Sequence, residues 1–285
     1  MDDRHPKPGF IEVDGHRLRW SVWPGQDPPL LLVGGLGANI EMWAPLRHAL
    51  APRATIAFDA PGAGESSLPL RPLAIDQLSG LVATALNQLA VSEIDVLGYS
   101  FGGSVAQALA RSRPHLVRRL VLVGATSGWG GLWLNPLAVA ALLTPARYFS
   151  PQHTRWANRT TFGDPPSASF SHLDRARAAR PPHPVGYWWQ IVAIATWSSH
   201  DWLDQIQHET LVLVGALDRA APLANSAALA RRIGRARLHV VADAGHLLLL
   251  ADETRDVSSR ITDFLDRGHA PDRQPDAAPP LLAER

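Results

Sequence analysis

Short apolar segments that end at a glycine or a turn recur along the chain and alternate with longer amphipathic segments. Short runs of Val, Leu and Ile with such boundaries are typical of buried parallel strands. The predicted strands are Leu30–Val33, Thr55–Phe58, Ile94–Leu97, Leu120–Val123, Leu211–Val214 and Leu238–Val241. The segment Ile75–Leu89 instead repeats its apolar residues at helical spacing, so that they share one face. This alternation predicts the α/β class, with a mainly parallel central sheet flanked by helices.

A different pattern opens the chain. Residues 11–13 and 18–23 alternate between polar and apolar positions, and the turn-forming pair Asp14 and Gly15 lies between them. Two alternating segments joined by Asp-Gly predict an antiparallel hairpin with a tight turn.

The alternation of predicted strands and helices is interrupted between residues 125 and 205. This stretch contains seven of the ten tryptophans and two Pro-Pro pairs, and we interpret it as a mostly helical lid inserted over the sheet. Residues 1–124 and 206–267 are then the core. Residues 268–285 are rich in Pro, Ala, Asp and Arg and lack periodicity, so we expect a disordered tail.

Composition narrows the function classes. Of the 285 residues 46% are hydrophobic and 19% charged, which is enough apolar material for a sizeable core, and the net charge of +1 favours neither nucleic acid nor an anionic membrane. The absence of cysteine excludes disulfides, thiolate metal sites and a cysteine nucleophile. The polar N-terminus is unlike a signal peptide, and no apolar run is long enough to span a bilayer. We therefore expect a cytoplasmic protein without a transmembrane segment.

The candidate chemistry starts at Gly98, Ser100 and Gly102, which form the pattern Gly-x-Ser-x-Gly. The bare pattern arises by chance in roughly one chain in ten of this length, so its context carries the argument. A predicted strand runs into it and a helical pattern runs out of it. A sharp strand-to-helix turn of this kind needs small residues on both sides and projects its serine above the sheet as a nucleophile.

A serine nucleophile needs a histidine base that is oriented by a carboxylate. His246 and Asp218 each follow a predicted strand, at the sheet edge where α/β proteins place their sites, and in the chain order Ser, Asp, His. Asp243, three residues before His246, is the alternative acid. We favour Asp218, because it ends a separate strand and can approach the imidazole from the side away from Ser100.

An oxyanion hole requires two backbone N–H groups. We expect one from Phe101, directly after the serine, and the other from Leu36 in the glycine-rich loop that follows the first parallel strand. That loop has neither the Gly-x-Gly-x-x-Gly pattern nor a Walker lysine, so a phosphate site is disfavoured. Asp59 is interpreted as bracing its own turn. No histidine spacing suits a metal, and we predict neither a metal nor a cofactor.

The segment Gly186–Gln190 places Tyr and two Trp residues in a row. Three consecutive rings cannot all face one side of a helix or strand, so at least one should face a pocket, a partner or solvent. We expect Tyr99, Trp188 and Trp189 to contact an apolar substrate, with the lid as a surface for docking on a hydrophobic phase.

Several segments carry a family resemblance. They are Leu31–Glu41, Phe58–Ser67, Thr144–Pro151 and Gly186–Gln207. Across residues 9–267 the chain resembles the α/β-hydrolases, and within them the intracellular medium-chain-length polyhydroxyalkanoate depolymerases. The resemblance implies an α/β-hydrolase fold and an esterase acting, without a cofactor, on polyesters of (R)-3-hydroxyalkanoic acids stored in granules. Ser100, Asp218 and His246 fall where the family has its nucleophile, acid and base.

Three positions depart from the family pattern. Gly34 stands where most α/β-hydrolases have His and these depolymerases have Asn, Phe101 replaces a Trp, and residues 216–217 are less acidic than usual. None of these changes removes a catalytic group. Two alternatives remain: a small-ester carboxylesterase or cofactor-free perhydrolase of the same fold, and a non-catalytic granule-associated or ligand-binding protein. The intact set of Ser, Asp and His argues against the last, and Ser at position 100 argues against a dehalogenase or epoxide hydrolase.

Overall fold

The computed structural model describes residues 7–129, 140, 150, 154, 156, 161–165, 167–251 and 254–267. Within them, eight strands form one sheet in the order β1-β2-β4-β3-β5-β6-β7-β8. The strands are β1 Lys7–Val13, β2 His16–Trp23, β3 Gln26–Val33, β4 Arg53–Phe58, β5 Ile94–Tyr99, β6 Val117–Val123, β7 Glu209–Gly215 and β8 Ala236–Val241. The pairs β1–β2 and β2–β4 are antiparallel and the others parallel, which confirms the predicted α/β class and its mainly parallel sheet.

The opening hairpin follows from its turn residues. Strand β1 pairs with β2 up to Val13 and His16, so Asp14 and Gly15 alone form the connection. Both have positive φ, 49° and 77°, as a two-residue hairpin turn requires. The hairpin predicted from the Asp-Gly pair is therefore present.

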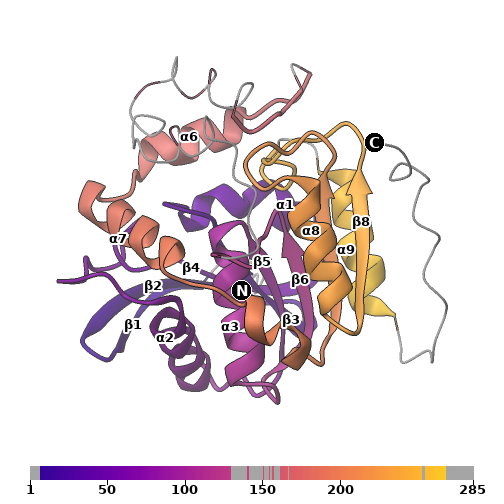
Figure 1. The fold of residues 1–285 in the computed structure, drawn as a ribbon. Coiled ribbons are helices and arrows are strands. Elements are labelled where there is room, and N and C mark those ends of the chain that lie inside the picture. The colour runs from indigo at the N-terminus through magenta and orange to yellow at the C-terminus, as the bar shows by residue number, and fades with distance from the viewer. Residues whose placement is uncertain are drawn as a thin grey trace.

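Helices cover both faces of the sheet, and Figure 1 shows them flanking it. They are α1 Ala44–Ala49, α2 Ile75–Gln88, α3 Phe101–Ser112, α8 Leu223–Arg232 and α9 Arg255–Asp266. One apolar cluster joins α2, α3 and α8 to the sheet, and a second joins α1 and α9 to its other face. Helix α2 begins at Ile75 and buries Leu78, Leu81, Val82 and Leu86, the face that the sequence predicted.

Strand β8 is more exposed to solvent than the other parallel strands. The sequence predicted Leu238–Val241 as a buried strand, yet Leu238 is 39% exposed and Val240 is 37% exposed. The reason is its position, because β8 pairs only with β7 and forms the edge of the sheet within the described residues. Edge strands are covered less completely than central ones.

The segment after β6 includes α6 Ser171–Ala179, α7 Pro184–Ala195 and the 3-10 helix η3 His200–Gln205. Helices α6 and α7 lie apart from the helices that flank the sheet, as Figure 1 shows. Helix α7 begins against the loop after β4, where a Cβ on Gly186 would lie 2.5 Å from the carbonyl oxygen of Gly62. Much of residues 130–160 and all of 268–285, the predicted tail, lie outside the described part of the chain. No helix in the described part is both long and apolar enough to cross a membrane.

Candidate active site

The turn between β5 and α3 holds Ser100 in a strained conformation. Its φ of 53° and ψ of −119° are rarely adopted by a residue with a side chain. The flanking glycines make this turn possible: a Cβ on Gly98 would lie 2.6 Å from the carbonyl oxygen of Gly102, and one on Gly102 would lie 2.1 Å from that of Val33. The chain therefore meets the packing demands of a nucleophile turn, and Ser100 sits directly before the N-terminus of α3.

The structure brings Ser100, His246 and Asp218 together from the ends of β5, β8 and β7. The imidazole Nδ1 of His246 lies 2.8 Å from Oδ2 of Asp218, and its Nε2 lies 3.0 Å from Oγ of Ser100. A carboxylate can only accept, so the neutral ring carries its proton on Nδ1 and presents a lone pair at Nε2 to the serine hydroxyl. This arrangement can remove the proton from Ser100.

Asp218 is fixed from its other side as well. Its Oδ1 accepts the backbone N–H groups of Ala220 and Ala221 at 2.9 and 2.8 Å, and the residue is buried. The rival acid Asp243 is exposed and forms part of the turn before His246. Of the two candidates, Asp218 is the carboxylate that contacts the imidazole.

A glycine at the end of β6 leaves room for the imidazole. Gly124 has a φ of 53°, and a Cβ there would lie 3.0 Å from both Cε1 and Nδ1 of His246 and 3.3 Å from Oδ2 of Asp218. Any side chain at this position would press on the contact between the histidine and the acid. In the sequence, Gly124 marks only the end of a predicted strand.

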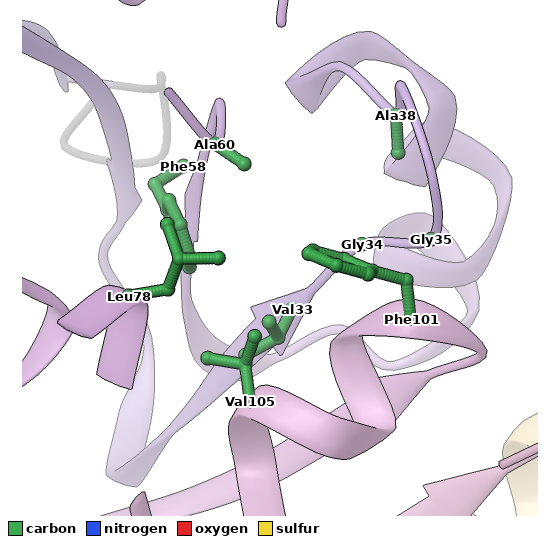
Figure 2. A pocket seen from close by; sticks show the side chains of 9 residues that line it. All are labelled: Val33, Gly34, Gly35, Ala38, Phe58, Ala60, Leu78, Phe101 and Val105. Carbon is green, nitrogen blue, oxygen red and sulfur yellow. The ribbon is translucent and has the colours of Figure 1, made fainter. Parts of the chain in front are cut away.

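Two small cavities meet at the glycine-rich loop that follows β3. One is lined by Ser100, His246 and Leu36, so Leu36, predicted as an oxyanion donor, lies at the same cavity as the serine. Phe101, predicted as the other donor, is the first residue of α3, and its ring lines the second cavity together with Phe58. Figure 2 shows that second cavity, whose lining side chains are all hydrocarbon. Gly35 and Ala38 line both.

The three predicted substrate contacts have different surroundings. Tyr99 is buried, donates its hydroxyl to the carbonyl oxygen of His246 at 3.1 Å and lines the serine cavity. Trp188 is 42% exposed, whereas Trp189 donates its Nε1–H to the carbonyl oxygen of Pro69. Neither tryptophan lines either of these two cavities. The prediction that consecutive rings face different ways matches the buried Tyr187 beside the exposed Trp188.

A short segment of the insertion, residues 161–165, holds the loop that carries His246. The backbone N–H of His246 donates to the carbonyl oxygen of Phe162 at 2.8 Å, and the Phe162 ring stacks on the imidazole. Asp164 accepts the N–H of Leu247 through Oδ1 at 3.1 Å. Burial raises the pKa of Asp164 to about 7 against the opposing effect of His246. No motif in the sequence indicated this contact.

The glycine-rich loop is held from two sides. Asp59 accepts the N–H of Ile40 through Oδ1 and that of Glu65 through Oδ2, at 2.8 and 2.9 Å, so it braces the turns after β3 and β4. Burial raises the pKa of Asp59 to about 6. From helix α7, Gln190 accepts the N–H of Gly37 at 2.8 Å. Gln190 belongs to the aromatic segment Gly186–Gln190, and no pattern in the sequence indicates its contact with Gly37.

A strained serine and a histidine held by a buried aspartate, at the carboxyl edge of a parallel sheet, have the arrangement of a hydrolase site. The chain belongs to the alpha/beta hydrolase fold family, which residues 28–253 match. It is an enzyme of the carboxylic ester hydrolase class.

The similar proteins are hydrolases of several kinds. The chain is 36% identical over 247 residues to a poly(3-hydroxyalkanoate) depolymerase of Ectopseudomonas oleovorans, covering 84% of this chain and 86% of that one. It is 29% identical to a 2-hydroxy-6-oxo-2,4-heptadienoate hydrolase of Pseudomonas putida, covering 90% and 94%. A solved hydrolase from Pseudomonas aeruginosa has a TM-score of 0.75 at 26% identity, covering 91% and 98%.

Proposed function

We propose that the protein is a serine ester hydrolase that cleaves medium-chain poly(3-hydroxyalkanoate) to 3-hydroxy acids through an acyl-enzyme. The observation that carries the proposal is the contact of His246 with both Ser100 and Asp218. The similarity to a poly(3-hydroxyalkanoate) depolymerase supports the choice of polymer.

In the proposed reaction, His246 takes the proton of Ser100 as the serine oxygen attacks the ester carbonyl. The N–H groups of Phe101 and Leu36 stabilise the oxyanion, and Asp218 stabilises the imidazolium. The leaving alcohol takes the proton from His246. Water then attacks the acyl-enzyme by the same steps, which frees the acid and restores Ser100.

The hydrocarbon cavity beside the serine suits an alkyl side chain. Its lining includes Phe58, Leu78, Phe101 and Val105, and Figure 2 shows their side chains converging on one space. Burying methylene groups against such a lining is favourable by about 0.8 kcal/mol for each group. An apolar lining of this kind favours an alkyl group over a polar one.

An apolar face on α7 supports contact with a polymer surface. Val185, Trp188 and Val192 recur at helical spacing and are 41%, 42% and 38% exposed. The neighbouring Trp189 ties the helix to Pro69 at 3.1 Å, so this face is held beside the loop that precedes α2. We assign it to the surface of polyester storage granules in the cytoplasm.

The test is the clearing of amorphous granules of short and of medium side-chain length, with soluble p-nitrophenyl esters in parallel. We expect wild type to clear medium-chain granules and Ser100→Ala to clear none, with Ser100→Ala still folded by circular dichroism. Ester turnover without clearing would favour the small-ester carboxylesterase or perhydrolase alternative. Absence of labelling by a fluorophosphonate probe would favour a non-catalytic protein, because the probe requires an activated serine.

The contact of the apolar face of α7 with granules is tested by comparing Trp188→Gln with Phe10→Gln. Phe10 is an exposed aromatic residue on β1. We expect Trp188→Gln to lower the ratio of granule clearing to soluble-ester hydrolysis by about tenfold, since it removes one large apolar contact. Phe10→Gln should keep the wild-type ratio. An unchanged ratio in Trp188→Gln would show that α7 does not meet the polymer.

A further inference from the structure

The side chain that precedes the nucleophile is hydrogen-bonded to the backbone of the base. Tyr99 ends β5, and Ser100 follows it at the strained turn. The Tyr99 hydroxyl donates to the carbonyl oxygen of His246 at 3.1 Å, across 147 positions of sequence. The centre of its ring also lies 5.4 Å from that of the imidazole, at an angle of 36°. One side chain thus connects the strand that carries the nucleophile to the loop that carries the base.

The same ring packs against the glycine-rich loop after β3. A Cβ added to Gly35 would lie 3.2 Å from Cε1 and 3.3 Å from Cδ1 of Tyr99, so the backbone of this loop lies against the ring. Gly35 precedes Leu36, to which we assign an oxyanion donor. Trp43 adds an edge-on contact, with ring centres 6.4 Å apart. Tyr99 is therefore buried among the nucleophile turn, the base loop and the oxyanion loop, where packing restricts its movement.

His246 is held at both polar groups of its backbone. Its N–H donates to the carbonyl oxygen of Phe162 at 2.8 Å, and its carbonyl oxygen accepts the hydroxyl of Tyr99. The imidazole extends from this backbone to Ser100, with Nε2 3.0 Å from Oγ. Of these two backbone contacts, the one from Tyr99 comes from β5, the strand that leads to Ser100. It ties the position of the base to that of the nucleophile.

We propose that Tyr99 is a positioning residue for the base, whose hydroxyl keeps His246 at the distance from Ser100 that proton transfer requires. The inference rests on the roles of Ser100 and His246 in the proposed function. It adds to the role expected from the sequence, in which Tyr99 contacts an apolar substrate. A catalytic group displaced by about 1 Å can lose about a hundredfold in rate, so a hydrogen bond that acts through a backbone carbonyl matters for turnover.

The test is Tyr99→Phe, which removes the hydroxyl and keeps the ring that lines the serine cavity. We expect kcat for p-nitrophenyl octanoate to fall by about tenfold, with KM within about twofold of the wild-type value. A hydroxyl that contacted substrate instead would change KM. An unchanged kcat, or a change confined to KM, would overturn the proposal.

The matched control is Thr210→Val, near the start of β7. Thr210 is buried and donates its hydroxyl to the carbonyl oxygen of His208 at 2.9 Å, at the end of the strand away from Asp218. Each variant loses a buried hydroxyl that donates to a backbone carbonyl, so we expect similar losses in the free energy of unfolding, measured by chemical denaturation. Thr210→Val should keep the wild-type kcat. Equal falls in kcat would assign the effect to lost stability and exclude positioning.

A measurement without substrate separates this inference from the proposed function. The proton on Nδ1 of His246 lies in the hydrogen bond to Asp218, and its downfield resonance reports the placement of the imidazole. We expect Tyr99→Phe to shift or broaden this resonance and Thr210→Val to leave it unchanged. Full hydrolysis by Ser100→Ala would sink the proposed function, while a shifted resonance in Tyr99→Phe would still support the positioning of His246. An unchanged resonance in Tyr99→Phe would exclude it.

Discussion

The backbone N–H of Gly37 donates a hydrogen bond to Oε1 of Gln190 at 2.8 Å, across 153 positions of sequence. Gln190 belongs to α7 and is 3% exposed, and Gly37 follows Leu36 in the loop after β3. Helix α7 thus holds the loop to which we assign one of the two oxyanion donors. The position of that donor depends on α7 as well as on the sheet.

Gln190→Leu keeps the approximate volume of the side chain and removes the acceptor. The Gly37 N–H would then be buried without this partner, at a cost of about 1 to 3 kcal/mol that the loop can relieve by moving. We expect kcat for a soluble p-nitrophenyl ester to fall by about tenfold, with a smaller change in KM. Thr196→Ala, at the exposed end of α7, is the control. An unchanged kcat in Gln190→Leu would separate α7 from the oxyanion site.

Gly124→Ala should lower catalytic activity more than it lowers the stability of the fold. The new Cβ would lie 3.0 Å from the ring of His246, in a backbone conformation that costs a residue with a side chain about 1 to 2 kcal/mol. We expect kcat to fall at least about tenfold, measured on a soluble ester, because the imidazole must move away from Asp218.

The matched control for Gly124→Ala is Gly80→Ala. Gly80 lies inside α2, where an added Cβ meets nothing within 4 Å. Alanine is the better helix former there, so stability should rise by about 0.5 to 1 kcal/mol with activity unchanged. Equal kcat for both variants would show that the contact at Gly124 does not matter for catalysis.

Asp164 should make stability depend on pH. Its pKa rises from 3.8 to about 7 on folding, so the folded state holds the proton more tightly than the unfolded state. The stabilisation is complete below pH 4 and is lost as the pH rises through about 7. Asp164→Asn does not titrate and keeps an acceptor for Leu247. We expect its free energy of unfolding, relative to wild type, to gain about 3 kcal/mol between pH 5 and pH 8.

Chemical denaturation at several pH values measures this gain. Asp243→Asn, in the exposed turn of the same loop, should follow the wild-type pH dependence. A parallel pH dependence for Asp164→Asn and wild type would show that Asp164 does not hold its proton more tightly in the folded state.

A buried ion cluster near the start of β5 should govern stability rather than chemistry. Asp95 is fully buried, and Arg118 donates to its two oxygens at 2.8 and 2.5 Å. Burial still raises the pKa of Asp95 despite these contacts. Asp95→Asn should lower the free energy of unfolding by about 3 kcal/mol, because it removes the buried carboxylate to which Arg118 donates two hydrogen bonds. Exposed Glu93→Gln should change it by less than about 0.5 kcal/mol.

Local patterns in the sequence were enough to predict the sheet. The strand leading to Ser100 is a short apolar run before a glycine, and the turn at Asp14 and Gly15 has the residue types that its backbone requires. Ser100, Asp218 and His246 each follow a predicted strand, so one rule about parallel sheets sufficed to bring them to one edge.

The parts that escaped prediction depend on distant contacts. Gln190 and Asp164 come from the insertion, where no repeating pattern fixes which side chain meets the sheet edge. Nor does an apolar run reveal whether its strand is central or at an edge, which is why the exposure of Leu238 was missed. Such information lies in tertiary packing rather than in local composition.

The hydrogen bond from the N–H of His246 to the carbonyl oxygen of Phe162 has a consequence for evolution and engineering. The insertion would diversify freely if it only enclosed substrate, but here it also forms part of the scaffold of the base. In a chimera that receives a relative's insertion, a different backbone segment would position its own histidine. Substrate range and catalytic competence are therefore inherited together in this chain, and recombination that keeps residues 161–165 with residues 244–247 should preserve turnover where other crossovers lose it.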